Sequence, residues 1–415
     1  MGMSMTPRQR VANTVNRQKA DRIPIDLGGM RASGISASAY HRVKQRLGIH
    51  TPTRIADAQF MIAEVEDAVR ERLHLDVLPL DWSMAFNSLQ PDSAWSPRKL
   101  PDGTPVLIAP DTRIGEDAEG NWVLLKPDGT PTTLRMPRGG FYFDDCSADE
   151  PGGISPAQFQ PVMDLPDEQL ALFARHAKHL RETTTYAMLG WGFGVCFLGM
   201  SRAASSGANV IQGKPSEWMV MLSTEKDTCH EMMDRAVESS IRCLSQIHQA
   251  IGDTCFAWGI AADDSGTQRG EFIPPELWAE MILPHYKKLC DWIHQHTQMK
   301  TFFHSCGSVH NLIPHFIEAG IDILNPVQIS ATQMEPARLK REFGDKLVFW
   351  GGGCDTQSVL PRGTPDEVRE HVRENMQVFG LGGGYIFNQV HNIQANVPSD
   401  NILAMLDEAY TCAAR

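Results

Sequence analysis

The sequence predicts an α/β fold of the (β/α)8, or TIM, barrel type. Eight short runs of apolar and β-branched residues are typical of strands, and helical patterns lie between most of them. The last four strand–helix units are short and regular, which favours a closed barrel over a doubly wound open sheet. The eight expected strands are 23–27, 75–80, 183–189, 254–261, 300–306, 321–327, 347–352 and 385–390.

Helices with recognisable ends are expected in the second half of the chain. Thr364 is a good N-cap for a helix that starts at Pro365 and stops before Gly380, because Thr accepts from the first free N–H groups and Pro needs no partner there. The expected helices are 275–296, 308–319, 336–343, 364–379 and 399–414.

One region, about 95–153, does not fit the alternation. It has little helical periodicity, and turn signals recur at Pro101-Asp102-Gly103, Glu119-Gly120-Asn121, Pro127-Asp128-Gly129 and Gly139-Gly140. We interpret it as a β-meander inserted after the second strand, serving as a lid, an oligomer contact or a solvent-facing decoration. The whole chain, 1–415, is expected to form a single barrel domain with an N-terminal extension and this insert.

Composition excludes several classes of function. The formal net charge is −12 and no Lys/Arg cluster resembles a phosphate track, which argues against nucleic acid as a partner. The chain lacks the run of about 18 apolar residues that a membrane span needs. The first twenty residues carry four basic side chains and no apolar segment, unlike a signal peptide, so we expect a cytoplasmic protein. Nine cysteines in a chain this long do not suggest a disulfide framework.

The fifth expected strand ends in the triplet His304-Ser305-Cys306. Side chains two apart on a strand point to the same side, so His304 and Cys306 would both face the barrel mouth, where barrel enzymes carry their chemistry. Imidazole nitrogen and thiolate sulfur are preferred zinc ligands. Taken alone, this pair is a weak signal, since a buried His and a packing Cys give the same pattern.

Two neighbouring strand ends supply further candidate ligands. Cys354 follows the seventh strand and His391 follows the eighth. A catalytic zinc needs three protein ligands and one open position. The sequence leaves open which three of His304, Cys306, Cys354 and His391 bind the metal, and whether a carboxylate replaces one of them.

Other polar and aromatic groups also follow strands. Asp264 is a candidate ligand, general acid or orienting partner, and the adjacent pair Asp263-Asp264 is expected to supply one structural cap and one functional group. Other candidates for substrate binding are polar groups at strand ends and aromatic residues that would form an apolar wall, each with core packing as the competing interpretation. They are Met30, Arg31, Trp191, Phe193, Asn325, Gln328 and Trp350.

Several segments resemble a known family. The opening Thr6-Pro-Arg-Gln-Arg-Val-Ala-Asn and Asp21-Arg-Ile-Pro-Ile-Asp resemble uroporphyrinogen-decarboxylase-like proteins. Four later segments are similar to the methyltransferase branch of that superfamily: His304-Ser-Cys-Gly-Ser-Val, Asp322-Ile-Leu-Asn-Pro-Val-Gln, Phe349-Trp-Gly-Gly-Gly-Cys-Asp-Thr-Gln and Pro398-Ser-Asp-Asn-Ile-Leu-Ala-Met.

The resemblance implies a (β/α)8 barrel and corrinoid-linked methyl transfer. In zinc members of that branch, a His-x-Cys pair and one later Cys bind the metal, and His304 and Cys306 match the pair. The place of the later Cys holds His391, ten residues before Asn401. Either His391 substitutes as a ligand, or Cys354 on the adjacent strand does.

We therefore expect a zinc-dependent methyltransferase. It would move a methyl group from a small O-methylated substrate, for instance a methoxylated aromatic, to the cobalt of a separate corrinoid protein, because no Asp-x-His-x-x-Gly corrinoid motif is present. The alternatives are methyl transfer from a methyl-corrinoid to a thiol or folate, uroporphyrinogen-type decarboxylation, and a non-catalytic metal-stabilised docking module. Arg31 is the single arginine in Gly28-Gly-Met-Arg-Ala-Ser-Gly, where true decarboxylases carry a more basic stretch. The oligomeric state is left open, with a homodimer as one alternative.

Overall fold

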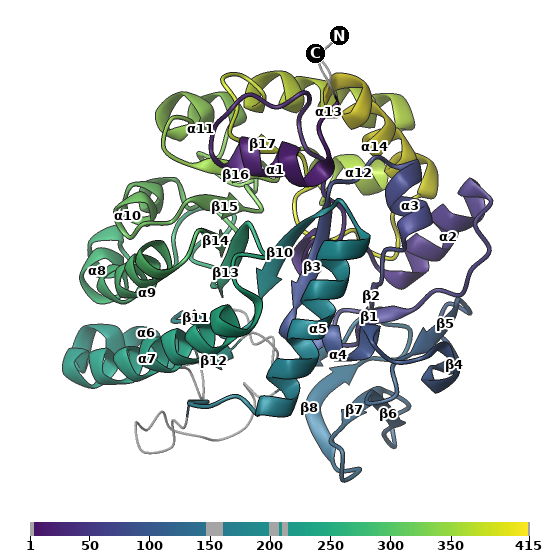
Figure 1. Cartoon of the computed structure of the whole chain (residues 1–415), viewed down its shortest axis with the longest axis horizontal. Helices are drawn as coiled ribbons and strands as arrows, with labels where there is room; N and C mark the ends of the chain where they lie inside the picture. Colours follow the sequence, from purple (N-terminus) through teal and green to yellow (C-terminus); the bar gives the residue numbers. More distant parts are fainter. Residues whose placement is uncertain (1–3, 147–160, 199–206, 210–214, 414–415) are drawn as a thin grey trace.

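A curled parallel sheet forms the centre of the molecule. The computed structural model describes residues 4–146, 161–198, 207–209 and 215–413. Seven parallel strands lie in the spatial order β17-β16-β15-β14-β13-β10-β3 (Figure 1). Their bounds are β3 (Val77–Asp81), β10 (Ala187–Trp191), β13 (Ala257–Ala262), β14 (Lys300–His304), β15 (Ile323–Asn325), β16 (Val348–Trp350) and β17 (Tyr385–Ile386).

The segment around Ile25 closes this sheet into a barrel. Ile25 forms a parallel bridge with Phe387, just beyond β17. On its other side, the N–H of Asp76, just before β3, donates to the Ile25 carbonyl at 2.8 Å. The segment thus takes the eighth strand position between the two edges, and the predicted (β/α)8 barrel is confirmed.

Apolar side chains fill both the inside of the barrel and the layer around it. Inward-facing Leu189, Phe302 and Trp350 belong to one buried cluster, which also contains Val11 and Val15 of helix α1 (Pro7–Val15). Helix α1 therefore closes the end of the barrel at which β3 and β10 begin (Figure 1). The larger cluster lies between strands and helices.

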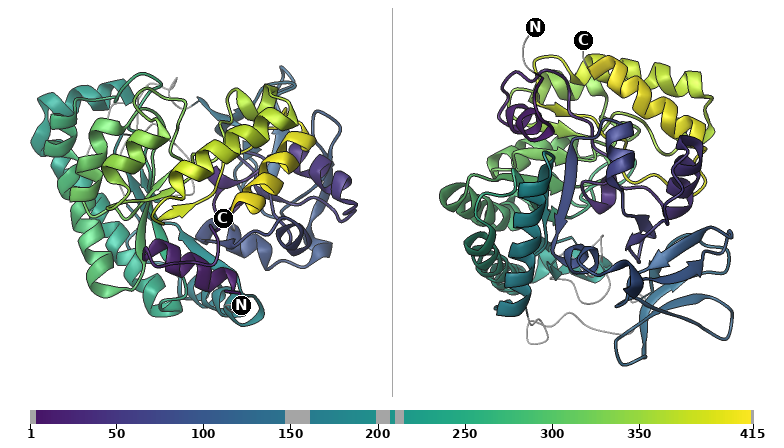
Figure 2. Two further views of the ribbon diagram at one scale, coloured as in Figure 1. Left: turned by 90° about the horizontal axis from the view of Figure 1, so that it is seen from above. Right: turned by 45° about the vertical axis from the view of Figure 1, so that its right-hand side comes forward.

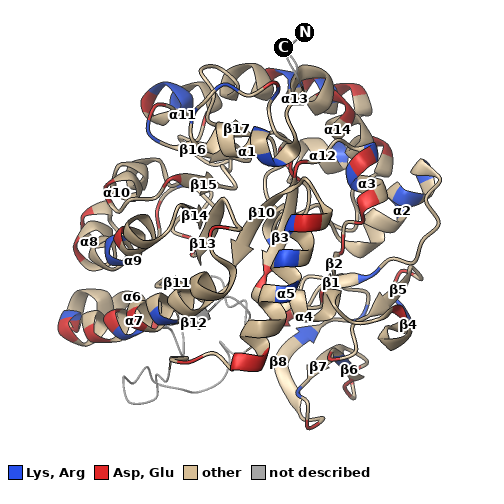
Figure 3. Cartoon of the chain, viewed as in Figure 1, with Lys and Arg blue, Asp and Glu red and all other residues tan. Residues whose placement is uncertain are grey.

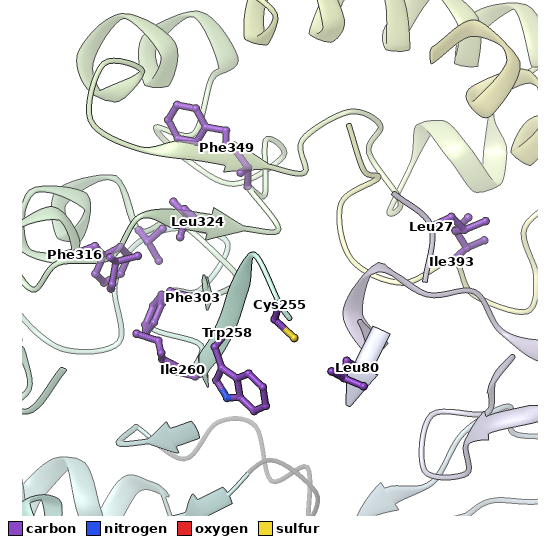
Figure 4. Close-up of a cluster of buried hydrophobic side chains, with 14 of the residues drawn as sticks. Leu27, Leu80, Cys255, Trp258, Ile260, Phe303, Phe316, Leu324, Phe349 and Ile393 are labelled. Atoms are coloured by element: carbon purple, nitrogen blue, oxygen red, sulfur yellow. The ribbon is translucent and has the colours of Figure 1, made fainter. Parts of the chain in front are cut away.

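That outer cluster is shown in Figure 4. Phe303 of β14 packs against Phe316, with ring centroids 4.9 Å apart. Phe316 belongs to helix α10 (Ile313–Glu318), so this contact joins the barrel wall to its outer ring of helices.

The outer helices match the predicted pattern with three local differences. The expected helix 275–296 is two helices, α8 (Pro275–Met281) and α9 (Leu283–His296), because Pro284 has no N–H to continue the first one. The expected helix 308–319 starts with a short 3-10 turn and is α-helical only in α10. Residue 183 ends a helix instead of starting a strand.

The remaining helices include those expected at 336–343, 364–379 and 399–414. Helix α13 begins at Pro365 with the predicted Thr364 cap, which forms a reciprocal capping box with Glu367. Helix α13 spans Pro365–Phe379, and the other helices are α2 (Ala37–Leu47), α3 (Asp67–Arg72), α4 (Trp82–Ser88), α5 (Asp167–Thr183), α6 (Pro215–Thr224), α7 (Lys226–Ile251), α11 (Pro336–Phe343), α12 (Val359–Arg362) and α14 (Ser399–Ala413). Basic and acidic residues are interspersed along helix α13, whereas the charged residues of α11 are mostly basic (Figure 3).

The predicted insert is an antiparallel β region beside the barrel (Figure 2). A two-stranded sheet pairs β4 (Ser96–Lys99) with β5 (Pro105–Ile108), and a four-stranded sheet has the order β6-β7-β8-β9. The latter strands are β6 (Arg113–Glu116), β7 (Trp122–Leu125), β8 (Pro131–Met136) and β9 (Asp144–Asp145). Residues 147–153 of the predicted meander lie outside the described residues.

A helix that spans a bilayer needs about 20 predominantly apolar residues in succession. Among the described residues, every helix is too short or too polar to cross a bilayer.

Candidate metal centre

Three nitrogen and sulfur donors meet where strands β14 and β17 end. His304 is the last residue of β14, Cys306 follows it by two, and His391 follows β17. Their ligand atoms all lie within 4.8 Å of one another. His304 Nε2 is 3.4 Å from Cys306 Sγ, and the two imidazole rings meet edge to face with centroids 5.4 Å apart. The closure of the barrel brings His391 to the pair, although it lies far along the chain.

Asn325 fixes the orientation of the His304 ring. The register of the parallel strands sets His304 of β14 beside Asn325 of β15. Asn325 Oδ1 lies 2.6 Å from His304 Nδ1, while Asn325 Nδ2 donates to the Trp350 carbonyl at 2.8 Å. Because the amide nitrogen has a carbonyl acceptor, Oδ1 must face the ring, where it accepts the Nδ1 proton. This leaves the Nε2 lone pair of His304 directed at the other donors.

His391 is oriented by a similar amide. Its Nδ1 lies 2.8 Å from Asn392 Oδ1, which also accepts from Gln394 Nε2 at 2.7 Å. The backbone of His391 is left-handed, with φ of +65°, a conformation that non-glycine residues rarely adopt. This turn re-aims the side chain relative to the strand before it, and such local strain is typical of functional sites.

A partly exposed carboxylate borders the three donors. Asp264 Oδ1 accepts from the Cys306 N–H at 2.8 Å and lies 3.9 Å from His304 Nε2. Its side chain is 28 % exposed, so it can exchange protons with water.

The adjacent carboxylate, Asp263, has a structural role. Asp263 is completely buried and accepts the N–H groups of Phe197 and Leu198 at 2.8 and 2.9 Å, together with the Tyr286 hydroxyl at 2.7 Å. Burial raises its pKa to about 6. Asp263 therefore anchors the 197–198 segment, and Asp264 alone of the two faces the donors.

The protonation states suit a cation that binds nitrogen and sulfur. Burial lowers the pKa of His304 to about 4, so its imidazole is neutral, which is the form that binds metals. Burial and the Asp264 charge raise the pKa of the Cys306 thiol well above its usual value. Two imidazoles and one thiol match the donor preference of zinc, because a bound cation favours the thiolate form of the cysteine.

The loop after Cys306 is held by close backbone contacts. Gly307 has φ of +92°, and a Cβ there would lie 2.1 Å from the Gly266 carbonyl oxygen. Gln328 Oε1 accepts the Gly307 N–H at 2.8 Å. Gln328, expected to bind substrate, thus holds this turn, and Asn325 has both ends of its amide engaged within the protein.

Cys354 does not belong to the group of three donors. It is completely buried, and its Sγ lies 3.9 Å from the Asp355 carbonyl oxygen. Burial raises the pKa of its thiol, as expected for a small core side chain.

The aromatic residues that are candidates for a substrate wall each contact other groups of the protein. Trp350 lies inside the barrel with no exposed surface, and its indole N–H donates to buried Asp26 at 2.9 Å. Trp191 meets Phe302 edge to face, with centroids 6.1 Å apart. Phe193 packs outside the barrel against Trp82 at 5.3 Å, and Met30 is buried with the interior cluster.

Arg31 is bound by two carboxylates. Its Nε lies 2.9 Å from Asp57 Oδ2, and its Nη2 lies 3.4 Å from Asp81 Oδ2. Nη2 also donates to the Ser83 hydroxyl. The positive charge expected to meet a substrate is therefore balanced within the protein. Neither acid was among the sequence candidates, although Asp81 ends β3 and could have been found there.

Comparisons with known proteins agree with the barrel. The family model described as uroporphyrinogen decarboxylase (URO-D) matches residues 157–412. The uroporphyrinogen decarboxylase of Pseudoalteromonas translucida (strain TAC 125) is 29% identical over 76 residues, 18% of this chain and 21% of that protein. The chain thus spans about a fifth of the length of this curated relative.

A solved structure, a methyltransferase from Methanosarcina mazei, superposes over nearly the full length. The match covers 98% of this chain and 99% of that one with a TM-score of 0.56 at 14% identity, a likeness of fold. The family model extends over more than half of the chain, from the segment before α5 into α14. The protein is therefore a member of the uroporphyrinogen decarboxylase (URO-D) family.

Proposed function

We propose that this protein is a zinc-dependent methyltransferase that moves a methyl group from a small O-methylated substrate to the cobalt of a separate corrinoid protein. The observation that carries the proposal is the convergence of His304, Cys306 and His391 within 4.8 Å. Three protein donors leave a position for a substrate, as in catalytic zinc sites. The fold shared with a methyltransferase supports the same reaction class.

The three donor side chains are of the types that zinc prefers. His304 and His391 each have Nδ1 bound by an asparagine oxygen, so both would offer Nε2, with Cys306 as the thiolate. A bound zinc ion would supply Lewis acidity that polarises an ether oxygen.

Asp264 is the residue to which we assign proton transfer. In the overall reaction the O–CH3 bond breaks, the methyl carbon forms a bond to the partner's reduced cobalt, and the substrate oxygen takes a proton. Asp264 lies beside Cys306 and His304 and is 28 % exposed, so it can take a proton from water and pass it to the leaving oxygen. Asn325 and Asn392 keep the imidazoles from rotating while this happens.

Decarboxylation of a porphyrinogen is the second candidate, because the family model and the curated relative carry that name. Such a substrate bears several carboxylates that need cationic partners. Arg31 is already balanced by Asp57 and Asp81, which favours methyl transfer as the first proposal.

Metal analysis of single variants tests the centre. Cys306→Ala and His391→Ala should each lose zinc on dialysis, whereas Cys354→Ala, at a buried cysteine outside the group, should retain it. Full zinc content in His391→Ala together with loss in Cys354→Ala would assign the third ligand to Cys354 and refute the site proposed here.

An assay of methyl transfer tests the reaction. Free reduced cobalamin and a panel of methoxylated aromatics should give the methylcobalamin spectrum with the wild type, and much less with Asp264→Asn. Release of CO2 from uroporphyrinogen without any methylcobalamin formation would instead establish the decarboxylase.

A further inference from the structure

The backbone conformation of His391 depends on support from its surroundings. Its φ of +65° is left-handed, and a residue with a Cβ keeps such a conformation only where the structure around it holds it there. The contacts made by the residues on either side of His391 therefore decide whether its imidazole stays beside the other two donors.

The loop after β16 holds the residue that immediately precedes His391. The N–H of Val390 donates to the Cys354 carbonyl at 2.9 Å, and the Thr356 hydroxyl donates to the Val390 carbonyl. Both backbone polar groups of Val390 are thus bonded to this loop. The Val390 carbonyl belongs to the same planar peptide unit as the His391 N–H, so the Thr356 hydroxyl fixes the plane from which His391 departs.

The chain is held again just after His391. The N–H of Ile393 donates to the Gly34 carbonyl at 2.9 Å, and the Ile393 carbonyl accepts from the Ser36 N–H at 2.8 Å. Two residues, His391 and Asn392, lie between Val390 and Ile393. A shift of the Val390 carbonyl would therefore be taken up at His391, because the chain beyond it is fixed.

The turn that carries Thr356 is itself fixed by hydrogen bonds. The neighbouring Asp355 carboxylate accepts from the N–H groups of Gln357 at 3.0 Å and Ser358 at 3.1 Å. The Asp355 N–H donates to His371 Nε2 of α13 at 3.2 Å. These bonds restrain the backbone on both sides of Thr356, so its hydroxyl is presented in one direction, as the support of a precise site requires.

We propose that Thr356 is a positioning residue for the third metal donor: through the Val390 carbonyl, its hydroxyl holds His391 in the conformation that brings the imidazole to the other two donors. The inference rests on the zinc centre of the proposed function. It also gives Cys354 a role that does not involve its sulfur, since the backbone carbonyl of this residue holds the N–H of Val390.

Zinc affinity of full-length variants, measured by competition with a chromophoric chelator, tests this role. Thr356→Val keeps the shape of the side chain, Thr356→Ala shortens it, and both lack the hydroxyl. Each should bind zinc about tenfold more weakly than the wild type, as expected when a group that orients a metal ligand is removed. Thr356→Ser keeps a hydroxyl and should bind zinc with an affinity close to that of the wild type.

Cobalt(II) in place of zinc reports on the ligands directly, because its d–d absorption depends on which groups bind the metal and in what geometry. At saturating cobalt, the spectrum of Thr356→Val should differ from that of the wild type, and Thr356→Ser should give the wild-type spectrum.

Thr297→Val is the matched control. Thr297 is 7 % exposed, and its hydroxyl donates to the Ile293 carbonyl at 2.8 Å. It precedes the start of β14, at the opposite end of that strand from His304. Thr297→Val should lower the midpoint of thermal unfolding about as much as Thr356→Val does, and it should leave zinc affinity unchanged.

The outcomes separate this role from the zinc centre itself. Wild-type zinc affinity in Thr356→Val, together with loss of zinc in His391→Ala, would overturn the role of Thr356 and leave the centre intact. Equally weak binding by Thr356→Ser would overturn it because the hydroxyl would not be the cause, and equally weak binding by Thr297→Val would do so because general loss of stability would explain the effect. Absence of zinc from the wild type would refute the centre, and with it any role of Thr356 in holding a ligand.

Discussion

Asn325 Oδ1 lies 2.6 Å from His304 Nδ1, across two adjacent parallel strands whose register makes the two residues neighbours. The same amide donates to the Trp350 carbonyl on the next strand. One side chain therefore ties a proposed metal ligand to two strands of the barrel wall. Rigid support of this kind is what keeps a ligand in place when the metal is absent.

Replacing Asn325 by Val should weaken zinc binding by about 10- to 100-fold, because His304 loses the acceptor that fixes its tautomer and ring angle. The variant should also lose about 1–3 kcal/mol of stability, since buried polar groups of His304 and Trp350 lose their partner. Competition with a chromophoric chelator measures the first effect and chemical denaturation the second.

The control for this prediction is Asn311→Val, at an exposed asparagine outside the centre. Asn311→Val should leave zinc affinity and the free energy of unfolding close to those of the wild type. Unchanged zinc affinity in Asn325→Val would mean that His304 is held by its packing alone.

Much of the fold could be predicted from the sequence because its cause is local. The strands are recognisable as apolar runs with helices between them, and the Thr364 cap and the turn glycines of the insert act on their immediate neighbours. The division of the expected helix 275–296 into α8 and α9 at Ile282 could have been predicted from Pro284. The end of α5 at Thr183 could not, because β-branched residues there fit both a last helical turn and a first strand position.

The candidate centre could be predicted only in part. His304 and Cys306 follow from the alternation of a strand, and the choice of a third donor does not. Gly351 and Gly352 have φ of +130° and +67°, so side-chain alternation along β16 stops before Cys354 and gives no guide to where it points. No residue pattern in the sequence predicts the left-handed backbone conformation at His391 either. Both depend on how the closed barrel fits together.

A second prediction concerns the turn that follows Cys306. Gly307→Ala should destabilise the protein by clearly more than the roughly 1–2 kcal/mol of a left-handed alanine, because its Cβ would also lie 2.1 Å from the Gly266 carbonyl oxygen. That backbone must move, and the N–H of Cys306 would shift relative to Asp264. Chemical denaturation and zinc affinity should both report the change.

Gly103→Ala is the matched control for this turn. Gly103 has a similar φ of +86°, and a Cβ there would have nothing within 4 Å. It should show the cost of the backbone conformation alone and leave zinc affinity intact. Equal losses in the two variants would mean that the close approach of Gly266 relaxes without cost.

A third prediction concerns the charged cluster at the end of the barrel that helix α1 closes. There Arg10 pairs with Asp21 at 2.7 Å and with Asp76 at 2.6 Å. Partial burial alone would raise the pKa of Asp21, but hydrogen bonds from Arg10 and the Met5 N–H lower it to about 2. An unfolded aspartate titrates near 3.9. The folded state therefore binds fewer protons, and the stabilisation is complete above about pH 4 and lost as the pH falls toward 2.

Asp21→Asn should thus cost about 1–2 kcal/mol at pH 7, and the difference from wild type should shrink steadily below pH 4. Thermal unfolding between pH 7 and pH 3 measures it. Asp366→Asn is the control, because that carboxylate pairs with Arg369 while 95 % exposed, and such surface pairs contribute little. A difference between wild type and Asp21→Asn that stays constant down to pH 3 would show that Asp21 acts through the geometry of its hydrogen bonds, which the amide disturbs at every pH, and that its charge contributes nothing.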